Sequence, residues 1–112
     1  MNLGIITPNI LFRESLRSLL ENCSLTKDRY VILKDVTSQN IEELDVIISD
    51  YKLIKLEEIL LNLKIPKNKI KDIEKILITE RGLDLLPISS FHLTRPFRFS
   101  ELVEALHLII EQ

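Results

Sequence analysis

Short apolar runs alternate with longer amphipathic stretches along the chain, and this alternation restricts the fold more than any other feature. Five runs are predicted to be strands because they are rich in aliphatic and β-branched residues: 3–7, 29–36, 45–49, 75–79 and 90–94. Three other stretches repeat apolar residues every three or four positions, as helices do: 9–23, 55–65 and 99–110. Strands that alternate with helices predict an α/β fold with a doubly wound parallel sheet and helices on both faces.

The first helix shows the pattern most clearly. Its predicted inner face carries Phe12, Leu16, Leu19 and Cys23, and Asn9 is its expected N-cap. For the last helix the expected cap is Ser100 or its neighbour. The stretch 65–75 is expected to be a charged connector that can contain one helical turn.

Length and composition indicate one domain, residues 1–112, in a reducing cytoplasm. Cys23 is the only cysteine, which excludes an internal disulfide or a cysteine-based zinc cluster and favours a buried thiol. The net charge of −2 lacks the basic excess of a nucleic-acid-binding domain. No apolar run approaches the ~18 residues of a membrane span, and no leader opens the chain, so we expect no membrane attachment.

Four segments resemble the receiver domain of bacterial two-component response regulators. IITPNILFRESLRSLLE (5–21) is similar to the first strand and helix of receivers, and DVIISD (45–50) to the third strand, which ends in the phosphoacceptor aspartate. ILIT (76–79) is similar to the fourth strand and LTRPF (93–97) to the fifth. The resemblance implies a flavodoxin-like fold with five parallel strands in the order 2-1-3-4-5.

The resemblance also assigns roles to residues at the strand ends. Asp50 takes the phosphoacceptor position, Thr79 the switch threonine, and Arg95 the conserved lysine, followed by Pro96, whose peptide bond is commonly cis in the family. Independently, Thr7, Asp50, Thr79 and Arg95 each end a predicted strand, so we expect them to converge at the carboxyl edge of the sheet.

The predicted pocket departs from receivers at its metal-binding positions. Receivers place two adjacent acids where this chain has Thr7 and Pro8. Mg²⁺ prefers carboxylate oxygens, so we expect weak or absent Mg²⁺ binding, no cofactor and no enzymatic activity. The guanidinium of an arginine is planar and can donate two parallel hydrogen bonds to a carboxylate. We therefore expect Arg95 to pair with Asp50 in the space that a phosphoryl group and metal would use. His92 is either a switch-like residue or a surface residue on an edge strand.

Two connections are short for a receiver. Only residues 37–44 separate the second and third strands, and the connection from Thr79 to Arg95 contains Gly82 and Pro87, so the second and fourth helices of the receiver pattern are expected to be shortened or missing. Four apolar residues in the connection from Thr79 to Arg95 either form an exposed interface or fold back on the sheet: Leu83, Leu85, Leu86 and Phe91.

Five lysines lie close together in the connector after the second predicted helix, interleaved with Asp72 and Glu74: Lys64, Lys67, Lys69, Lys71 and Lys75. A phosphate-binding patch and a solvated loop both fit this pattern, and the mixed charge favours the solvated loop.

These features favour an atypical, phosphorylation-independent receiver-like domain of a bacterial signalling or transcription regulator, acting on a protein partner or as a homodimer. The alternatives are a working receiver phosphorylated on Asp50, a stand-alone adaptor or small-ligand sensor, and an unrelated flavodoxin-like enzyme. The first helix resembles receivers fused to a helix-turn-helix effector, which implies a DNA-binding domain in a longer chain.

Overall fold

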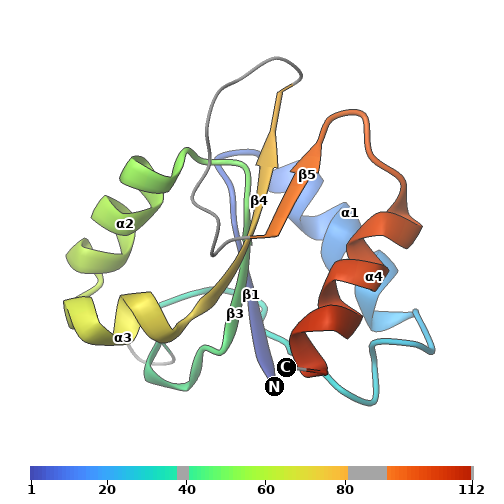
Figure 1. Ribbon diagram of the computed structural model, residues 1–112, viewed down its shortest axis with the longest axis horizontal. Helices are drawn as coiled ribbons and strands as arrows, with labels where there is room; N and C mark the ends of the chain where they lie inside the picture. The colour runs from blue at the N-terminus through green and yellow to red at the C-terminus, as the bar shows by residue number, and fades with distance from the viewer. Residues whose placement is uncertain (38–40, 81–90, 112) are drawn as a thin grey trace.

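The computed structural model describes residues 1–37, 41–80 and 91–111, and within them five parallel strands form one sheet in the order β2-β1-β3-β4-β5 (Figure 1). The strands are β1 (Asn2–Ile6), β2 (Val31–Ile32), β3 (Val46–Ser49), β4 (Glu74–Thr79) and β5 (Phe91–Thr94). This order confirms the predicted flavodoxin-like α/β fold.

Helices cover both faces of the sheet. The described helices are α1 (Ile10–Glu21), α2 (Leu53–Asn62), α3 (Lys67–Asp72) and α4 (Phe99–Ile110). α1 and α4 lie on one face and α2 and α3 on the other (Figure 1). Because side chains alternate along a strand, Ile48 packs in the α1/α4 core while its neighbour Ile47 packs in the α2/α3 core. All of β3 is buried, since helices cover both faces of the sheet there.

The strand register brings the carboxyl ends of the strands together at one edge. Ile6 of β1 pairs with Ser49 of β3, and Thr79 of β4 pairs with Thr94 of β5. β3 and β4 are also direct neighbours. The residues that follow β1, β3 and β5 and the last residue of β4 therefore lie at the same edge of the sheet.

The second strand is much shorter than the predicted run 29–36. β2 contains only Val31 and Ile32, and the following apolar residues turn onto the α2/α3 face of the sheet, where Val36 joins that core. Gly4 of β1 permits this approach, since a Cβ there would lie 2.7 Å from Val36 Cγ2 and 2.9 Å from Leu44 Cδ1. Side chains of the connection thus lie directly on the sheet, in the space that a helix would cover.

The described part of this connection holds a single 3-10 turn, Ile41–Glu43, where receivers have their second helix. This agrees with the predicted shortening. The connection in which the fourth helix was expected to be shortened, 81–90, lies outside the described residues.

The first helix confirms its predicted N-cap and corrects two predictions about its inner face. Asn9 is the N-cap of α1, as predicted, and its Oδ1 accepts the Phe12 N–H at 3.0 Å. Leu19 is exposed and Leu20 is buried instead. Both leucines continue the helical spacing from Leu16, so the spacing alone does not determine which of them packs against the sheet. Cys23 is half-buried rather than buried.

The N-cap of α4 was also misplaced. The cap is Arg98 rather than Ser100, and its N–H donates to Glu101 Oε1 at 3.1 Å. A carboxylate three residues into a helix can satisfy the cap N–H, so no hydroxyl is needed at the cap itself.

Lys75 corrects the interpretation of the lysines as a solvated loop. It lies in β4, is 9% exposed, and its Nζ donates to the carbonyl oxygens of Ile70 at 2.7 Å and Ile73 at 3.0 Å. The carbonyl oxygens at the end of α3 lack helical partners, which makes them acceptors for a nearby ammonium group.

None of the helices in the described ranges could cross a membrane, since the longest, α1 and α4, have 12 residues each.

Candidate functional site

Four predicted site residues lie at the carboxyl edge of neighbouring strands. Thr7 follows β1, Asp50 follows β3, Thr79 ends β4 and Arg95 follows β5. The Arg95 N–H donates to the Thr79 carbonyl oxygen at 2.8 Å, which continues the β4–β5 pairing past the end of β5. The sheet therefore holds the backbone of Arg95 beside the end of β4.

Arg95 forms the predicted ion pair with Asp50. Its Nη2 lies 3.1 Å from Asp50 Oδ2, within hydrogen-bonding distance. The Asp50 side chain is 13% exposed and that of Arg95 is 36% exposed, so the carboxylate is mostly removed from water while the guanidinium reaches the surface. The prediction that these two groups pair is confirmed.

The guanidinium makes two further contacts that the sequence analysis missed. Its Nη1 lies 3.4 Å from Glu80 Oε1, and its Cζ lies 5.0 Å from the centroid of the Phe12 ring, a cation–π distance. A guanidinium has more donors than one carboxylate can use. Glu80 directly follows Thr79 at the end of β4, so its contact with Arg95 could have been predicted from the sequence. Phe12 was assigned only to the core.

A tight turn follows β3 and presents Asp50. Ser49 is buried, and its Oγ accepts the Tyr51 N–H at 3.1 Å, which bends the chain around Asp50. Asp50 Oδ1 is buried and has no hydrogen-bond partner among the described residues. One carboxylate oxygen is thus occupied by Arg95 and the other is unpaired.

The donor groups at this edge do not fit Mg²⁺. The Thr7 hydroxyl accepts the Asn9 N–H at 3.2 Å, and Pro8 offers no side-chain oxygen. In residues 1–37, 41–80 and 91–111, no group of three or more His, Cys, Asp or Glu side chains could hold a metal ion. A hard cation needs several oxygens in a near-octahedral shell, whereas the carboxylates of Asp50 and Glu80 both contact the Arg95 guanidinium.

His92 and Pro96 flank the ion pair along the chain. His92 is exposed on β5, an edge strand, and partial desolvation lowers its pKa below the ordinary value. These properties favour the surface interpretation over a switch. The Arg95–Pro96 peptide bond is cis, as the resemblance implied.

The predicted interface is only partly described. Phe91 is half-buried against the α1/α4 core, which favours the alternative that it folds onto the sheet, because its position on β5 points it to that face. The other members of the predicted interface lie outside the described residues: Leu83, Leu85 and Leu86.

Comparisons of the chain with protein-family models, with curated proteins and with solved structures found no match. The fold and the strand-end residues are therefore the basis for any statement about function.

Proposed function

We propose that this chain is an atypical receiver-like domain that works without phosphorylation, as a protein-interaction or dimerisation module in bacterial signalling or transcription regulation. The proposal includes no enzymatic step and no resident metal.

The observation that carries the proposal is the 3.1 Å pair between Arg95 and Asp50. In receivers the equivalent aspartate must accept a phosphoryl group whose charge is neutralised by a metal and a lysine. Here Thr7 and Pro8 stand at the two acidic positions, and the cation contacts the carboxylate directly. A carboxylate that already has a cationic partner is a poorer nucleophile, and the second carboxylate at this edge, Glu80, contacts the same guanidinium.

Exposed apolar side chains near the same edge support the interaction part of the proposal. Ile10 and Leu11 open α1 and are 65% and 79% exposed, and Ile54, in the first turn of α2, is 84% exposed. Both helices start at the carboxyl edge, since they follow β1 and β3. Large apolar side chains this exposed, beside one site, are typical of a surface that contacts another protein.

Phosphorylation of the purified chain tests the proposal. We expect no mass change when the protein is incubated with Mg²⁺ and acetyl phosphate, measured by intact-protein mass spectrometry. The matched variant Thr7→Asp/Pro8→Asp/Arg95→Lys restores the receiver pattern and is expected to gain Mg²⁺ binding and one phosphoryl group. Adding Asp50→Asn to that variant should remove the gain.

A phosphoryl adduct on the unmodified protein, absent in Asp50→Asn, would contradict the proposal. Sedimentation velocity over a concentration series addresses the interaction part: a reversible dimer indicates a second copy as the partner, and a monomer throughout directs the search to a different protein.

One observation favours a second candidate, a working receiver. Asp50 Oδ1 is buried and unpaired, so one oxygen of the carboxylate is not blocked by Arg95. The same phosphorylation experiment separates the two candidates, because only the working receiver predicts an adduct without the three substitutions.

A further inference from the structure

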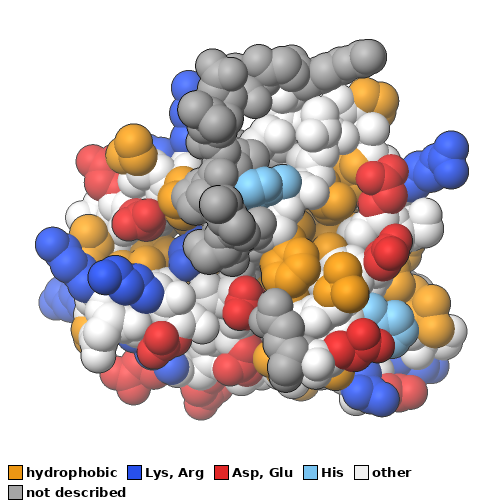
Figure 2. Space-filling model, viewed as in Figure 1, with side chains coloured by type: hydrophobic (Ala, Val, Ile, Leu, Met, Phe, Trp, Pro, Cys, Tyr) orange, Lys and Arg blue, Asp and Glu red, His pale blue; other side chains and the backbone are white. Residues whose placement is uncertain are grey.

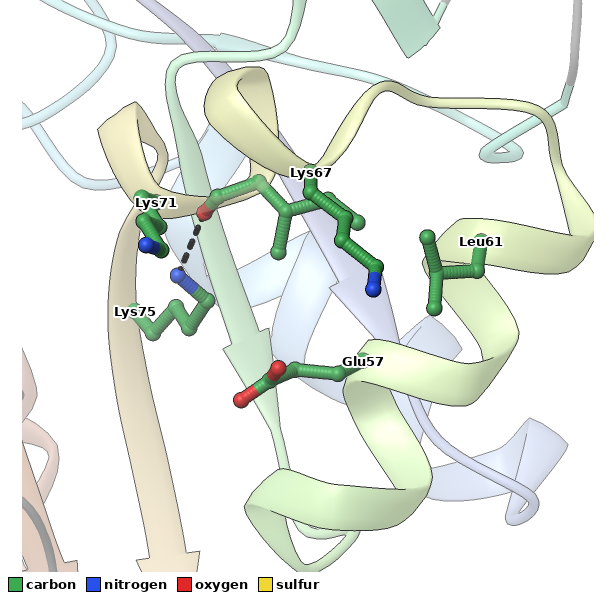
Figure 3. A pocket seen from close by; sticks show the side chains of 6 residues that line it. Glu57, Leu61, Lys67, Lys71 and Lys75 are labelled. Atoms are coloured by element: carbon green, nitrogen blue, oxygen red, sulfur yellow. Dashed lines mark hydrogen bonds between the residues drawn. The ribbon is translucent and has the colours of Figure 1, made fainter.

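A cavity of about 260 Å³ lies between α2, α3 and the start of β4, away from the carboxyl edge that holds Asp50 (Figure 3). Six residues line it: Glu57, Leu61, Lys67, Ile70, Lys71 and Lys75. Pockets for drug-sized ligands run from about 300 to 1,000 Å³, so this cavity suits a smaller molecule.

Charge in the cavity is strongly unequal, with three ammonium groups and one carboxylate in its lining. Figure 3 shows the charged ends of Lys67, Lys75 and Glu57 turned toward the space between the two helices, and Figure 2 shows several basic side chains on this side of the molecule with acidic ones around them. Among the described residues, no hydrogen bond or ion pair engages the side chains of Lys67, Lys71 or Glu57. These groups are therefore free to contact a ligand.

Lys75 gives the cavity a buried cation. Its ammonium group has three protons, and two of them are donated to Ile70 and Ile73. Burial lowers the pKa of Lys75, and the charges of Glu57 and Glu74 oppose that effect. An anion in the cavity would accept the remaining proton and offset the cost of burying the charge.

We propose that this cavity binds a small phosphate monoester that carries hydroxyl groups. The phosphate contacts Lys67, Lys71 and Lys75, and a ligand hydroxyl donates to Glu57. A phosphate monoester carries a charge of about −1.5 to −2 near pH 7, which matches the excess of ammonium groups over carboxylate. Leu61 and Ile70 provide apolar contact for the carbon skeleton. The inference is independent of the proposed signalling role, because it uses no residue of the Asp50 site.

A titration of the full ¹⁵N-labelled chain with glycerol 3-phosphate, followed by NMR at constant ionic strength, tests the inference. We expect saturable shifts of amides in α3 and at the start of β4, with a Kd on the order of 1 mM for so small a ligand. n-Propyl phosphate has the same number of carbons and no hydroxyl groups, and is expected to bind about fivefold more weakly because it cannot donate to Glu57.

Three variants separate the cavity from general charge. Lys67→Gln/Lys71→Gln should weaken glycerol 3-phosphate binding about tenfold or more, since both lysines are exposed and their loss leaves the fold intact. Glu57→Gln should remove most of the preference for glycerol 3-phosphate over n-propyl phosphate. The control Lys69→Gln removes a lysine of α3 that does not line the cavity and should change the Kd less than about twofold.

Three results would overturn the inference. The first is the absence of saturable shifts up to about 20 mM ligand, well above the expected Kd. The second is equal shifts with sulfate, which would indicate binding of any dianion. In the third, Lys69→Gln weakens binding as much as Lys67→Gln/Lys71→Gln.

Discussion

The two ends of the sheet each hold a largely buried charge, and they stabilise it in different ways. At the carboxyl edge, Asp50 is paired with the opposite charge of Arg95 at 3.1 Å. At the start of β4, Lys75 forms no ion pair with any described residue and donates to two backbone carbonyl oxygens instead. Asp50 thus has a cation in direct contact, whereas the acidic groups that act on Lys75, Glu57 and Glu74, do so without an ion pair.

This difference separates what each end can do. A carboxylate that is neutralised by its neighbour gains little from an additional cation, which is why the Asp50 site is a poor place for Mg²⁺. An ammonium group whose hydrogen bonds go to carbonyl oxygens still attracts an anion, because these oxygens satisfy its hydrogen bonds without removing its charge. Of the two ends, the start of β4 is the one whose buried charge has no direct counter-ion among the described residues, which leaves it available to a ligand.

Removing Lys75 should have the largest effect. We expect Lys75→Met to lower the free energy of unfolding by about 2–3 kcal/mol, because two charge-assisted hydrogen bonds are lost and two carbonyl oxygens lose their donor, while the apolar replacement offsets part of the loss. Chemical denaturation measures the change. Lys71→Met is the control, since Lys71 is exposed and its replacement should stay within about 0.5 kcal/mol.

The pH dependence of Lys75→Met provides a second measurement. Burial lowers the pKa of Lys75 below its ordinary value of 10.5, so between the lowered pKa and 10.5 the unfolded chain binds more protons than the folded one. The contribution of Lys75 to stability therefore rises with pH in that window. If wild type and Lys75→Met show the same dependence of unfolding free energy on pH, the pKa of Lys75 is the same in the folded and unfolded chain. Lys75 would then be as well compensated as Asp50.

A double-mutant cycle between Asp50 and Arg95 should give the next largest effect. We expect Asp50→Asn and Arg95→Gln to show a coupling energy of about 1 kcal/mol, at the upper limit for exposed pairs and below that of fully buried ones, because Asp50 is mostly buried and Arg95 is not. Denaturation of the four proteins measures the coupling.

Glu80→Gln is the matched control for this cycle. Glu80 contacts the same guanidinium at 3.4 Å, but its side chain is 66% exposed, so its coupling to Arg95 should stay within about 0.3 kcal/mol. If the coupling energy of Asp50 to Arg95 is no larger than that of Glu80, the ion pair does not neutralise Asp50. Asp50 would then remain available for phosphorylation.

The residues of the ion pair could be predicted from the sequence because the fold determines where they lie. Asp50 ends an unbroken apolar run, and parallel strands bring their carboxyl ends to one edge, so the meeting of Asp50 and Arg95 needed only the correct strand order. Glu80 and Phe12 complete the contacts of Arg95, but their involvement depends on where a long side chain comes to rest, which strand periodicity does not determine.

The features that could not be predicted depend on tertiary packing. The shortening of β2 follows from the space above Gly4, which admits Val36 and Leu44 to the sheet. The alternating pattern of residues 29–36 does not indicate that there is room for these side chains above Gly4. The burial of Lys75 was missed for a related reason, since mixed charge along a connector says nothing about which lysine lies beside the carbonyl oxygens at the end of α3.

Tyr30 sharpens the comparison because it makes the same kind of bond as Lys75 without a charge. Its buried hydroxyl donates to the Leu106 carbonyl oxygen at 2.6 Å. We expect Tyr30→Phe to cost about 1 kcal/mol of unfolding free energy, less than Lys75→Met, because a single neutral hydrogen bond is lost. Chemical denaturation at pH 8 measures it, and a loss equal to that of Lys75→Met would show that charge adds nothing to bonds of this kind.

The ionisation of Tyr30 can be followed separately. Burial raises its pKa from 10.0 to about 12, so the folded chain retains a proton that the unfolded chain loses, and the stability due to Tyr30 falls as the pH rises from 10 to 12. In a Tyr51→Phe background, the ultraviolet absorbance of tyrosinate should rise near pH 12 while the chain remains folded. A rise near pH 10 in the folded chain would contradict the burial of the hydroxyl.

His92 should give the smallest effect, since it is a partly desolvated group whose pKa is shifted by burial alone. The lowered pKa means that the unfolded chain binds more protons below pH 6.5, so stability due to His92 falls as the pH drops through that value. His92→Gln should remove this decline, with a change within about 0.5 kcal/mol at pH 5.5 and none at pH 8, where the imidazole is neutral in both states. The NMR titration of the imidazole C–H protons provides the direct measurement. A pKa of 6.5 would show that His92 is not desolvated, and a pKa above 6.5 would indicate an acidic group beside it, so that its charge would be paired as that of Asp50 is.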